Sequence, residues 1–256
     1  MSTTTPQTLT AKDRMSLPHQ SVPEREVAER VQDFGEVVLG YGQDQAMLEA
    51  QRCIQCGKPP CVDACAIKTD IRGFIKLIEQ GKLVEAYYKN LEVNPLAATC
   101  GRTCDHLCET VCVVGKKGKP VAIAFLKRAA ADAYVSEKRA GRITKNTPPV
   151  ERRKGRVAIV GAGPAGLACA SDLARKGYDV TVYEAAPVPG GMLYLGIPEF
   201  RLPRDIIEFE VQELRELGVT FRYDTPVGKA ITLAELRKDH DAVFLAIGAH
   251  RGKKMD

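Results

Sequence analysis

Eight of the nine cysteines in this chain of 256 residues fall into two groups of four. The first group has the spacing C-x2-C-x4-C-x3-C and consists of Cys53, Cys56, Cys61 and Cys65. The second group has the spacing C-x3-C-x3-C-x3-C and consists of Cys100, Cys104, Cys108 and Cys112. Eight thiolates are the full complement for two four-iron clusters that bind four thiolates each. The spacing therefore predicts two [4Fe-4S] clusters that carry electrons.

Zinc is the alternative metal, because it also binds thiolates. Structural zinc commonly uses paired C-x2-C knuckles, and only Cys53 and Cys56 have that spacing. On a straight helix the second group would extend over about 18 Å, so one centre could not bind all four thiolates. We therefore expect a bent segment that exchanges ligands with the first group, as in two-cluster ferredoxins. Cys169 stands apart in a predicted helix and is interpreted as a small core residue.

The composition excludes several classes of protein. Hydrophobic residues make up 45% of the chain, which is enough for packed cores, and the formal net charge is +5. The basic residues are scattered, so we expect a solvated surface that binds no nucleic acid. No apolar run approaches the roughly 18 residues of a membrane span, and the N-terminus lacks the apolar core of a secretory signal. We therefore expect a cytoplasmic protein, whose reducing compartment favours metal binding over disulfides.

The apolar pattern predicts a helical region before residue 140. We expect a disordered leader over residues 1–20 and a helical iron–sulfur domain over residues 21–140. Within it, Val27, Val31, Phe34 and Val38 predict a helix, and further helices are expected at residues 44–52 and 121–138. A helical hairpin is expected at residues 71–87, with its turn at Gly81. The first cysteine group is expected to be a loop, because its glycine and prolines cannot form regular helix.

A linker over residues 141–155 separates this region from a stretch of different composition at residues 156–256. Strands are predicted at residues 156–160, 179–184, 220–223 and 242–247, the last of them buried, and helices at 167–176, 205–217 and 233–238. Residues 156–184 have the order strand, glycine-rich turn, helix and strand, which starts a βαβ unit.

The glycine-rich turn reads G-x-G-x-x-G, which in this setting is a dinucleotide fingerprint. Gly161 allows the tight turn, Gly163 lets a pyrophosphate approach the backbone, and Gly166 lets the helix pack on the strand. Glu184 at the end of the next strand can bind ribose hydroxyls and would repel a 2′-phosphate, which argues against NADP at this site. The pair Gly190-Gly191 lets the backbone pass close to a ring system and favours a flavin dinucleotide.

These motifs resemble the small (beta) subunit of NADPH-dependent glutamate synthase. The same resemblance extends to the amino-terminal part of dihydropyrimidine dehydrogenase and to the large subunit of ferredoxin-dependent transhydrogenase. The stretches that carry it include CIQCGKPPCVDAC, VAIVGAGPAGLACASDLARKGYDVTVYEA and PGGMLYLGIPEFRLPR. The resemblance implies an all-α two-cluster iron–sulfur domain followed by an α/β Rossmann-like FAD-binding domain. That second domain is expected to be incomplete here, with the NAD(P)H domain of the family absent.

The resemblance also implies which residues bind each cofactor. One cluster is expected on Cys65, Cys104, Cys108 and Cys112, and the other on Cys53, Cys56 and Cys61 with Cys100 as the fourth ligand. Several relatives bind one cluster through a Glu or Gln at the position of Lys127, whose ammonium has no lone pair to give. Either Cys100 replaces that fourth ligand, or that cluster is labile. The residues implied to contact FAD are Gly161, Gly163, Pro164, Ala165, Gly166, Glu184, Gly190, Gly191, Leu193, Ile197, Pro198 and Gly248.

The favoured function is therefore an electron-transfer module of an NAD(P)H-dependent oxidoreductase. It would pass electrons between FAD and the two clusters, to or from a partner subunit in a hetero-oligomeric complex. No catalytic triad or pair of catalytic carboxylates is present in the sequence, so the chemistry is assigned to the cofactors. Two alternatives are a non-enzymatic relay or docking subunit with an empty FAD half-domain, and a structural protein stabilised by zinc.

Overall fold

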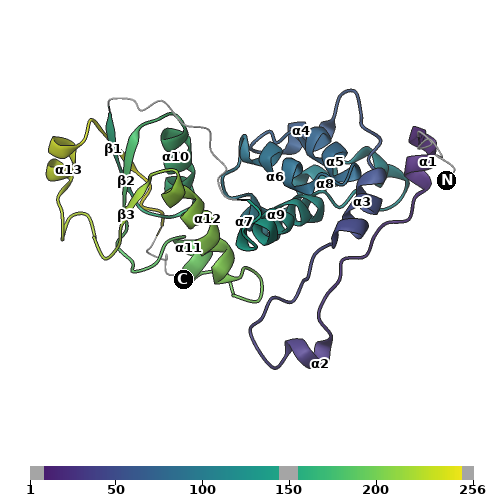
Figure 1. The fold of residues 1–256 in the computed structure, drawn as a ribbon, viewed down its shortest axis with the longest axis horizontal. Helices are drawn as coiled ribbons and strands as arrows, with labels where there is room; N and C mark the ends of the chain where they lie inside the picture. The colour runs from purple at the N-terminus through teal and green to yellow at the C-terminus, as the bar shows by residue number, and fades with distance from the viewer. Residues whose placement is uncertain (1–8, 144–154, 250–256) are drawn as a thin grey trace, which may run out of the picture. The chain divides into compact units, whose positions relative to one another are not determined.

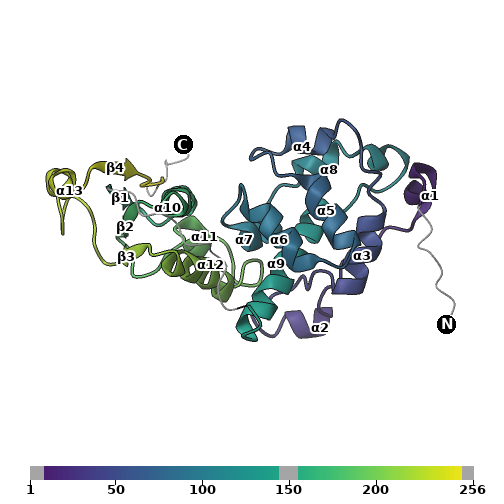
Figure 2. The ribbon, with the colours of Figure 1, turned by 45° about the horizontal axis from the view of Figure 1, so that its top comes forward.

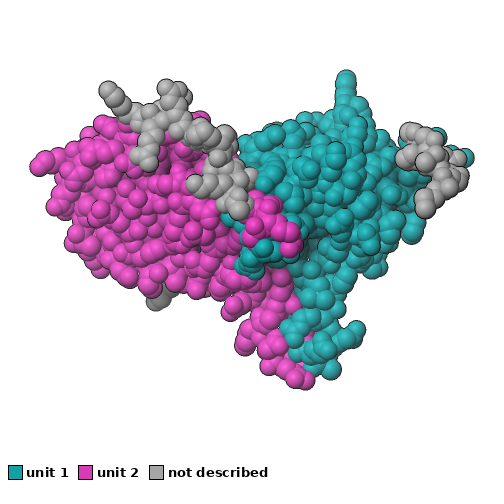
Figure 3. All heavy atoms as spheres, viewed as in Figure 1, with its two compact units in different colours: residues 1–29, 37–140 teal, residues 30–36, 141–256 magenta. Residues whose placement is uncertain are grey.

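The computed structural model describes residues 9–143 and 155–249, and the chain divides into two compact units. Figure 3 shows these units in two colours. Unit 1 contains residues 1–29 and 37–140, and unit 2 contains residues 30–36 and 141–256. Among the described residues, no helix has both the length and the apolar composition that a membrane crossing requires.

Unit 1 is built from helices around one long central helix (Figure 1). In chain order they are α1 (Ala11–Ser16), α2 (Val27–Arg30), α3 (Gln43–Gln51), α4 (Pro60–Ala64), α5 (Ile71–Glu79), α6 (Leu83–Leu91), α7 (Ala97–Thr103), α8 (Leu107–Thr110), the 3₁₀ turn η1 (Val113–Lys117) and α9 (Ile123–Arg139).

Helix α9 is the centre of this unit because small and aromatic side chains line its buried face. Ala130, Ala131 and Tyr134 are fully buried, and the Tyr134 ring stacks on Tyr87 of α6 with centroids 4.3 Å apart. Helices α5 and α6 form the expected hairpin, and Gly81 between them has φ +75°, which glycine adopts without strain. The predicted hairpin, the helix ending before Cys53 and the long helix after Pro120 are confirmed.

Three local expectations in unit 1 were wrong. Residues 11–16 of the expected disordered leader form α1, because Thr10 and Asp13 make a reciprocal capping box; residues 1–8 lie outside the described residues. The first cysteine group contains α4, which begins at Pro60, since proline is tolerated in the first helical turn.

The third wrong expectation concerns the predicted helix over Val27 to Val38. Only Val27–Arg30 is helical, and Val27 remains 61% exposed. The Arg25 amide instead donates to the Val37 carbonyl at 2.9 Å, and Glu24 and Val38 form an antiparallel bridge. Pairing between the two arms of this hairpin satisfies backbone groups that a continuous helix would have used.

Unit 2 contains a parallel sheet with strand order β3-β2-β1-β4. The strands are β1 (Arg156–Val160), β2 (Asp179–Tyr183), β3 (Thr220–Arg222) and β4 (Ala242–Leu245). The helices are α10 (Pro164–Arg175), α11 (Met192–Leu195), α12 (Arg204–Glu216) and α13 (Leu233–Asp239). Figure 2 shows α10 and α13 on opposite faces of the sheet. This order is that of a Rossmann half, and it brings the carboxyl ends of the strands to one edge.

Side chains alternate between the two faces of this sheet. Ala158 and Val160 of β1 pack with Leu236 of α13, whereas Ile159 points to the side of α10, near Gly166. The expectation of a buried last strand was wrong, because β4 lies at the edge of the described sheet and ends at Leu245. Phe244 and Leu245 are 41% and 54% exposed.

Candidate cofactor sites

Four thiols from three separate segments line a first hollow in unit 1. Cys53 follows α3, Cys56 follows it in the loop, Cys61 belongs to α4, and Cys112 precedes η1. Burial raises the pKa of Cys53 to about 11, and the thiols of Cys61, Cys112 and Cys56 act in the same direction, against a backbone hydrogen bond from Gln55. The remaining lining is largely apolar and includes Ile71, Ile75, Val114, Val121 and Ile123.

A second hollow, of about 320 Å³, is lined by the other four thiols of the two groups, which are Cys65, Cys100, Cys104 and Cys108. Burial raises the pKa of Cys108 to about 12, and Glu109 adds to this effect while Lys127 opposes it. Lys127 of α9 also lines this hollow and is only 8% exposed. The two hollows therefore contain all eight grouped cysteines, four in each.

The thiols that line each hollow differ from the ligand sets implied by the resemblance at Cys100 and Cys112, and the ligands of each cluster stay a prediction. The cause is a sharp bend in the second group. Helix α7 ends before Cys104, His106 has the left-handed conformation with φ +56°, and only one short helix follows before Cys112. The bend leaves Cys104 and Cys108 at the second hollow and returns Cys112 to the first. The expectation of a bent segment is confirmed, and the exchange of ligands between the two groups stays a prediction.

The donor set suits iron–sulfur clusters, because four thiols line each hollow and four thiolates are the usual ligands of a four-iron cluster. The Arg72 Nε, at the first hollow, is buried without a hydrogen-bond partner, and a cluster sulfide would supply an acceptor for it.

Hydrogen-bond donors surround the thiols of the second hollow. The Lys127 Nζ donates to Cys100 Sγ at 2.8 Å, and the His106 backbone amide donates to Cys104 Sγ at 3.4 Å. Burial acts to raise the pKa of Cys65, but hydrogen bonds from Thr69 and the charge of Lys127 lower it overall. Burial acts to lower the pKa of Lys127, but Cys100, Cys104 and Cys108 outweigh it and raise that pKa. At neutral pH the Lys127 side chain is thus an ammonium ion.

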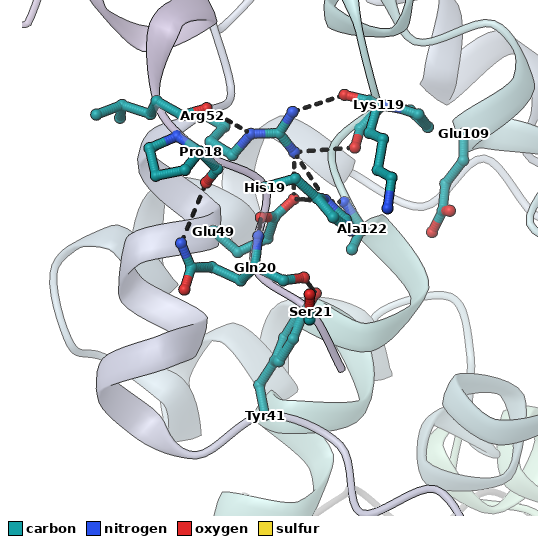
Figure 4. A network of polar contacts seen from close by, with 12 residues as sticks. Pro18, His19, Gln20, Ser21, Tyr41, Glu49, Arg52, Glu109, Lys119 and Ala122 are labelled. Atoms are coloured by element: carbon teal, nitrogen blue, oxygen red, sulfur yellow. Dashed lines mark hydrogen bonds and ion pairs between the residues drawn. The ribbon is translucent and has the colours of Figure 1, made fainter. Parts of the chain in front are cut away.

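A buried ion pair fixes the helix that delivers Cys53 (Figure 4). Glu49 is 0% exposed and accepts from Arg52 Nη1 at 2.6 Å, from the Ala122 amide at 2.9 Å and from the Gln20 amide at 2.9 Å. The Arg52 guanidinium also donates to the carbonyls of Lys119 and Pro120, at 2.6 and 2.9 Å. The network connects the N-terminal segment, the end of α3 and the start of α9. The sequence does not predict this network, because its partners lie far apart in the chain.

The glycine-rich turn of unit 2 has the geometry of a dinucleotide loop. Gly161 follows β1 with φ +106°, and Gly163 precedes α10, which begins at Pro164 and Ala165. A Cβ on Gly166 would collide with the Gly161 carbonyl oxygen, so only glycine allows this helix to approach the strand. A Cβ on Gly163 would meet nothing within 4 Å, which leaves open space beside the N-terminus of the helix. Free N–H groups at such an N-terminus bind phosphate.

Glu184 and the glycine pair lie at the same loop. The Glu184 side chain is 7% exposed and accepts from the Ala162 amide at 2.7 Å and from the Ala186 amide at 2.8 Å. Each carboxylate oxygen has a second lone pair, so a ribose hydroxyl can still be bound. Gly190 donates to the Ala162 carbonyl at 2.8 Å, and a Cβ on Gly191 would lie 3.1 Å from Gly163 Cα. The fingerprint, the acidic residue and the glycine pair therefore meet in one place.

The other residues expected to contact a flavin lie on two segments. Leu193, Ile197 and Pro198 belong to or follow α11, and Gly248 follows β4 with φ +64°. Arg204, which the sequence analysis did not single out, clamps the first segment. Its Nη1 and Nη2 donate to the carbonyls of Leu193 and Ile197 at 3.0 and 2.7 Å.

Comparison with protein families identifies the class of each part of the chain. Residues 30–139 match the model for dihydropyrimidine dehydrogenase domain II, 4Fe-4S cluster. Residues 159–199 match the model for the NAD(P)-binding Rossmann-like domain. The chain is therefore an iron–sulfur domain followed by a nucleotide-binding Rossmann-like domain.

Curated relatives are oxidoreductase subunits. The NADPH-Fe(3+) oxidoreductase subunit beta of Geobacter sulfurreducens is 40% identical over 90% of this chain and 34% of its own length. The glutamate synthase (NADPH) small chain of Azospirillum brasilense is 37% identical over 91% of this chain and 48% of its own length. A homologue of the NAD-dependent dihydropyrimidine dehydrogenase subunit PreT from Salmonella typhi is 37% identical over 86% of this chain and 52% of its own length. The resemblance inferred from the sequence is confirmed, and the chain spans about a third to a half of these relatives.

Proposed function

We propose that this chain is the electron-transfer part of an iron–sulfur flavoprotein oxidoreductase, with two [4Fe-4S] clusters in unit 1 and FAD in unit 2. The observation that carries the proposal is the division of eight cysteines into two sets of four around two hollows. Four thiolates are the usual complement of one four-iron cluster. When bound, the flavin would exchange electron pairs with a nicotinamide, and the clusters would carry electrons singly.

In unit 1 the residues hold the clusters and keep water from them. Cys53, Cys56, Cys61 and Cys112 would ligate the first cluster, inside a mostly apolar lining that also contains Arg72. Cys65, Cys100, Cys104 and Cys108 would ligate the second cluster, with Lys127 as a charged neighbour. Since free thiols here have raised pKa values at Cys53 and Cys108, cluster assembly would release protons.

In unit 2 we assign the site to FAD on two supports. Glu184 would accept hydrogen bonds from a ribose and repel a 2′-phosphate, which disfavours NADP. The close approach of Gly191 to Gly163 leaves a smooth backbone surface where a large ring system can pass. The FAD contacts proposed are Gly161, Gly163, Pro164, Ala165, Gly166, Glu184, Gly190, Gly191, Leu193, Ile197, Pro198 and Gly248.

The partner is proposed to be a second oxidoreductase subunit that receives or supplies the electrons. The support is that the relatives are named as beta or small subunits, which points to assemblies of several chains. The acceptor chemistry and the nicotinamide site would then lie outside the residues described here.

The test is an anaerobic absorbance spectrum of the purified chain, with iron, sulfide, zinc and flavin quantified on the same sample. We expect about eight irons and eight sulfides per chain, and flavin in a ratio near one. Cys53→Ser should remove about half of the iron, whereas Cys169→Ser, outside both hollows, should leave it unchanged. Clusters without flavin would favour a relay subunit with an empty nucleotide half-domain. Stoichiometric zinc without iron would refute the electron-transfer function.

A further inference from the structure

Lys127 is a buried cation at a hollow that the sequence assigns to negatively charged ligands. It lies on α9, is 8% exposed, and its Nζ is 2.8 Å from Cys100 Sγ. Burying an ammonium is unfavourable unless an anion compensates for the lost hydration. At this hollow Cys100 Sγ provides the direct contact, and as a cluster ligand it would be a thiolate.

The fold holds this pair together through a close helix crossing. Gly101 follows Cys100 in α7, and Arg128 follows Lys127 in α9. A Cβ on Gly101 would lie 2.8 Å from the Arg128 Cα, so the two helices touch through backbone atoms at this point. A larger residue at position 101 would push the helices apart. The contact between Lys127 and Cys100 is therefore set by the packing of α7 on α9, and does not depend on a freely moving lysine.

We propose that Lys127 is a charge-compensating residue, whose ammonium at Cys100 raises the reduction potential of the cluster bound at Cys65, Cys100, Cys104 and Cys108. This inference rests on the proposed function. Reduction adds a negative charge to the cluster, and a fixed cation within hydrogen-bond reach of a ligand sulfur stabilises that charge. Net charge and hydrogen bonds to sulfur are among the factors that set such potentials.

Other charged and polar groups also lie near the two hollows. The charge of Glu109 acts on Cys108 in the direction opposite to that of Lys127, but Glu109 Oε1 already accepts a hydrogen bond from the Ala124 amide at 2.8 Å. Asp105 lines the second hollow and is exposed, so solvent screens its charge. At the first hollow, Arg72 Nη1 is directed to the Gly57 carbonyl, and the uncharged Gln55 amide lies 3.5 Å from Cys53 Sγ. The direct contact between an ammonium and a ligand sulfur occurs at the second hollow.

The test is a redox titration of the whole chain followed by electron paramagnetic resonance, on wild type, Lys127→Met, Lys127→Gln and Lys127→Arg. Lys76→Met is the matched control, because it removes the same charge from the exposed face of α5. In Lys127→Met and Lys127→Gln we expect one of the two midpoints to fall. The expected shift is about tenfold or more in the ratio of reduced to oxidised cluster, or about 59 mV for one electron. Lys127→Arg and Lys76→Met should keep both midpoints near those of wild type.

Unchanged midpoints in both neutral variants, with full iron content, would overturn the proposal. Loss of half the iron from both neutral variants would also overturn it, because Lys127 would then be required for assembly rather than for the potential. A wild-type chain without iron would instead refute the proposed function itself. Measuring iron and sulfide on every sample separates these failures from one another.

Discussion

The buried Glu49–Arg52 pair gives a quantitative prediction about the stability of unit 1. Glu49→Gln removes one charge from a side chain that is 0% exposed and leaves the volume almost unchanged. The Arg52 guanidinium, 3% exposed, would then remain buried without its anion. The new amide also has only one accepting oxygen, so its NH₂ group would face one of the two backbone amides that Glu49 now binds.

Breaking a buried ion pair by removal of one partner lowers the free energy of unfolding by about 3–5 kcal/mol. With a urea dependence of about 2 kcal/mol per M, the unfolding midpoint should fall by about 2 M. Urea titration followed by circular dichroism measures this shift. Hydrogen exchange of the peptides around residues 17–21 and 119–123 should localise it, since these segments are joined through Glu49 and Arg52.

The control is Glu92→Gln, which removes an equal charge from an exposed pair with Lys89. Exposed pairs contribute little, so its midpoint should match that of wild type. Equal midpoints for Glu49→Gln and Glu92→Gln, with unchanged exchange in the two segments, would refute the view that the network holds unit 1 together.

Three further predictions concern other sites. Burial raises the pKa of Tyr41, whose hydroxyl donates to the Gln20 carbonyl at 2.7 Å. The contribution of Tyr41 to the free energy of unfolding should therefore be full below pH 10 and fall as the pH rises above it. Tyr41→Phe should reduce this loss of stability between pH 9 and 11 in urea titrations. Gly166→Ala should weaken flavin binding, measured by fluorescence titration, at least about tenfold, a loss of about 1.4 kcal/mol. Gly42→Ala is the control, because its Cβ meets nothing within 4 Å, and it should bind flavin normally. Arg204→Met should release the carbonyls of Leu193 and Ile197 and speed hydrogen exchange over residues 192–198, while unchanged exchange would remove Arg204 from the role of clamp.

The parts of the fold that the sequence predicts well depend on local chemistry. Gly161 and Gly166 occupy positions where the backbone conformation or a close approach excludes a side chain, so the fingerprint alone locates the loop. Gly81 likewise marks the turn of a hairpin whose buried stripe repeats with helical spacing. In these cases the glycine and the turn or close contact that requires it lie within a few positions of each other in the sequence.

The parts that the sequence does not predict depend on distant contacts. That Cys112 lines the first hollow and Cys100 the second follows from a left-handed His106, a conformation uncommon in non-glycine residues that the cysteine spacing does not predict. The Glu49 network connects residues up to 73 positions apart. The apolar residues after Val27 have helical spacing, yet pairing of Arg25 with Val37 makes that segment a hairpin. Tertiary contacts decide each of these cases.

The central claim is that the eight cysteines form two separate four-thiolate sites, and paired serine substitutions test it most directly. The measurement is iron and sulfide per chain, taken anaerobically on wild type and on two double variants. Cys53→Ser with Cys112→Ser disables the first site alone and should leave about four irons of about eight. Cys53→Ser with Cys100→Ser disables both sites and should leave almost none. The reverse pattern, with iron lost from the first double variant and half retained in the second, would contradict the assignment of ligands to the two sites.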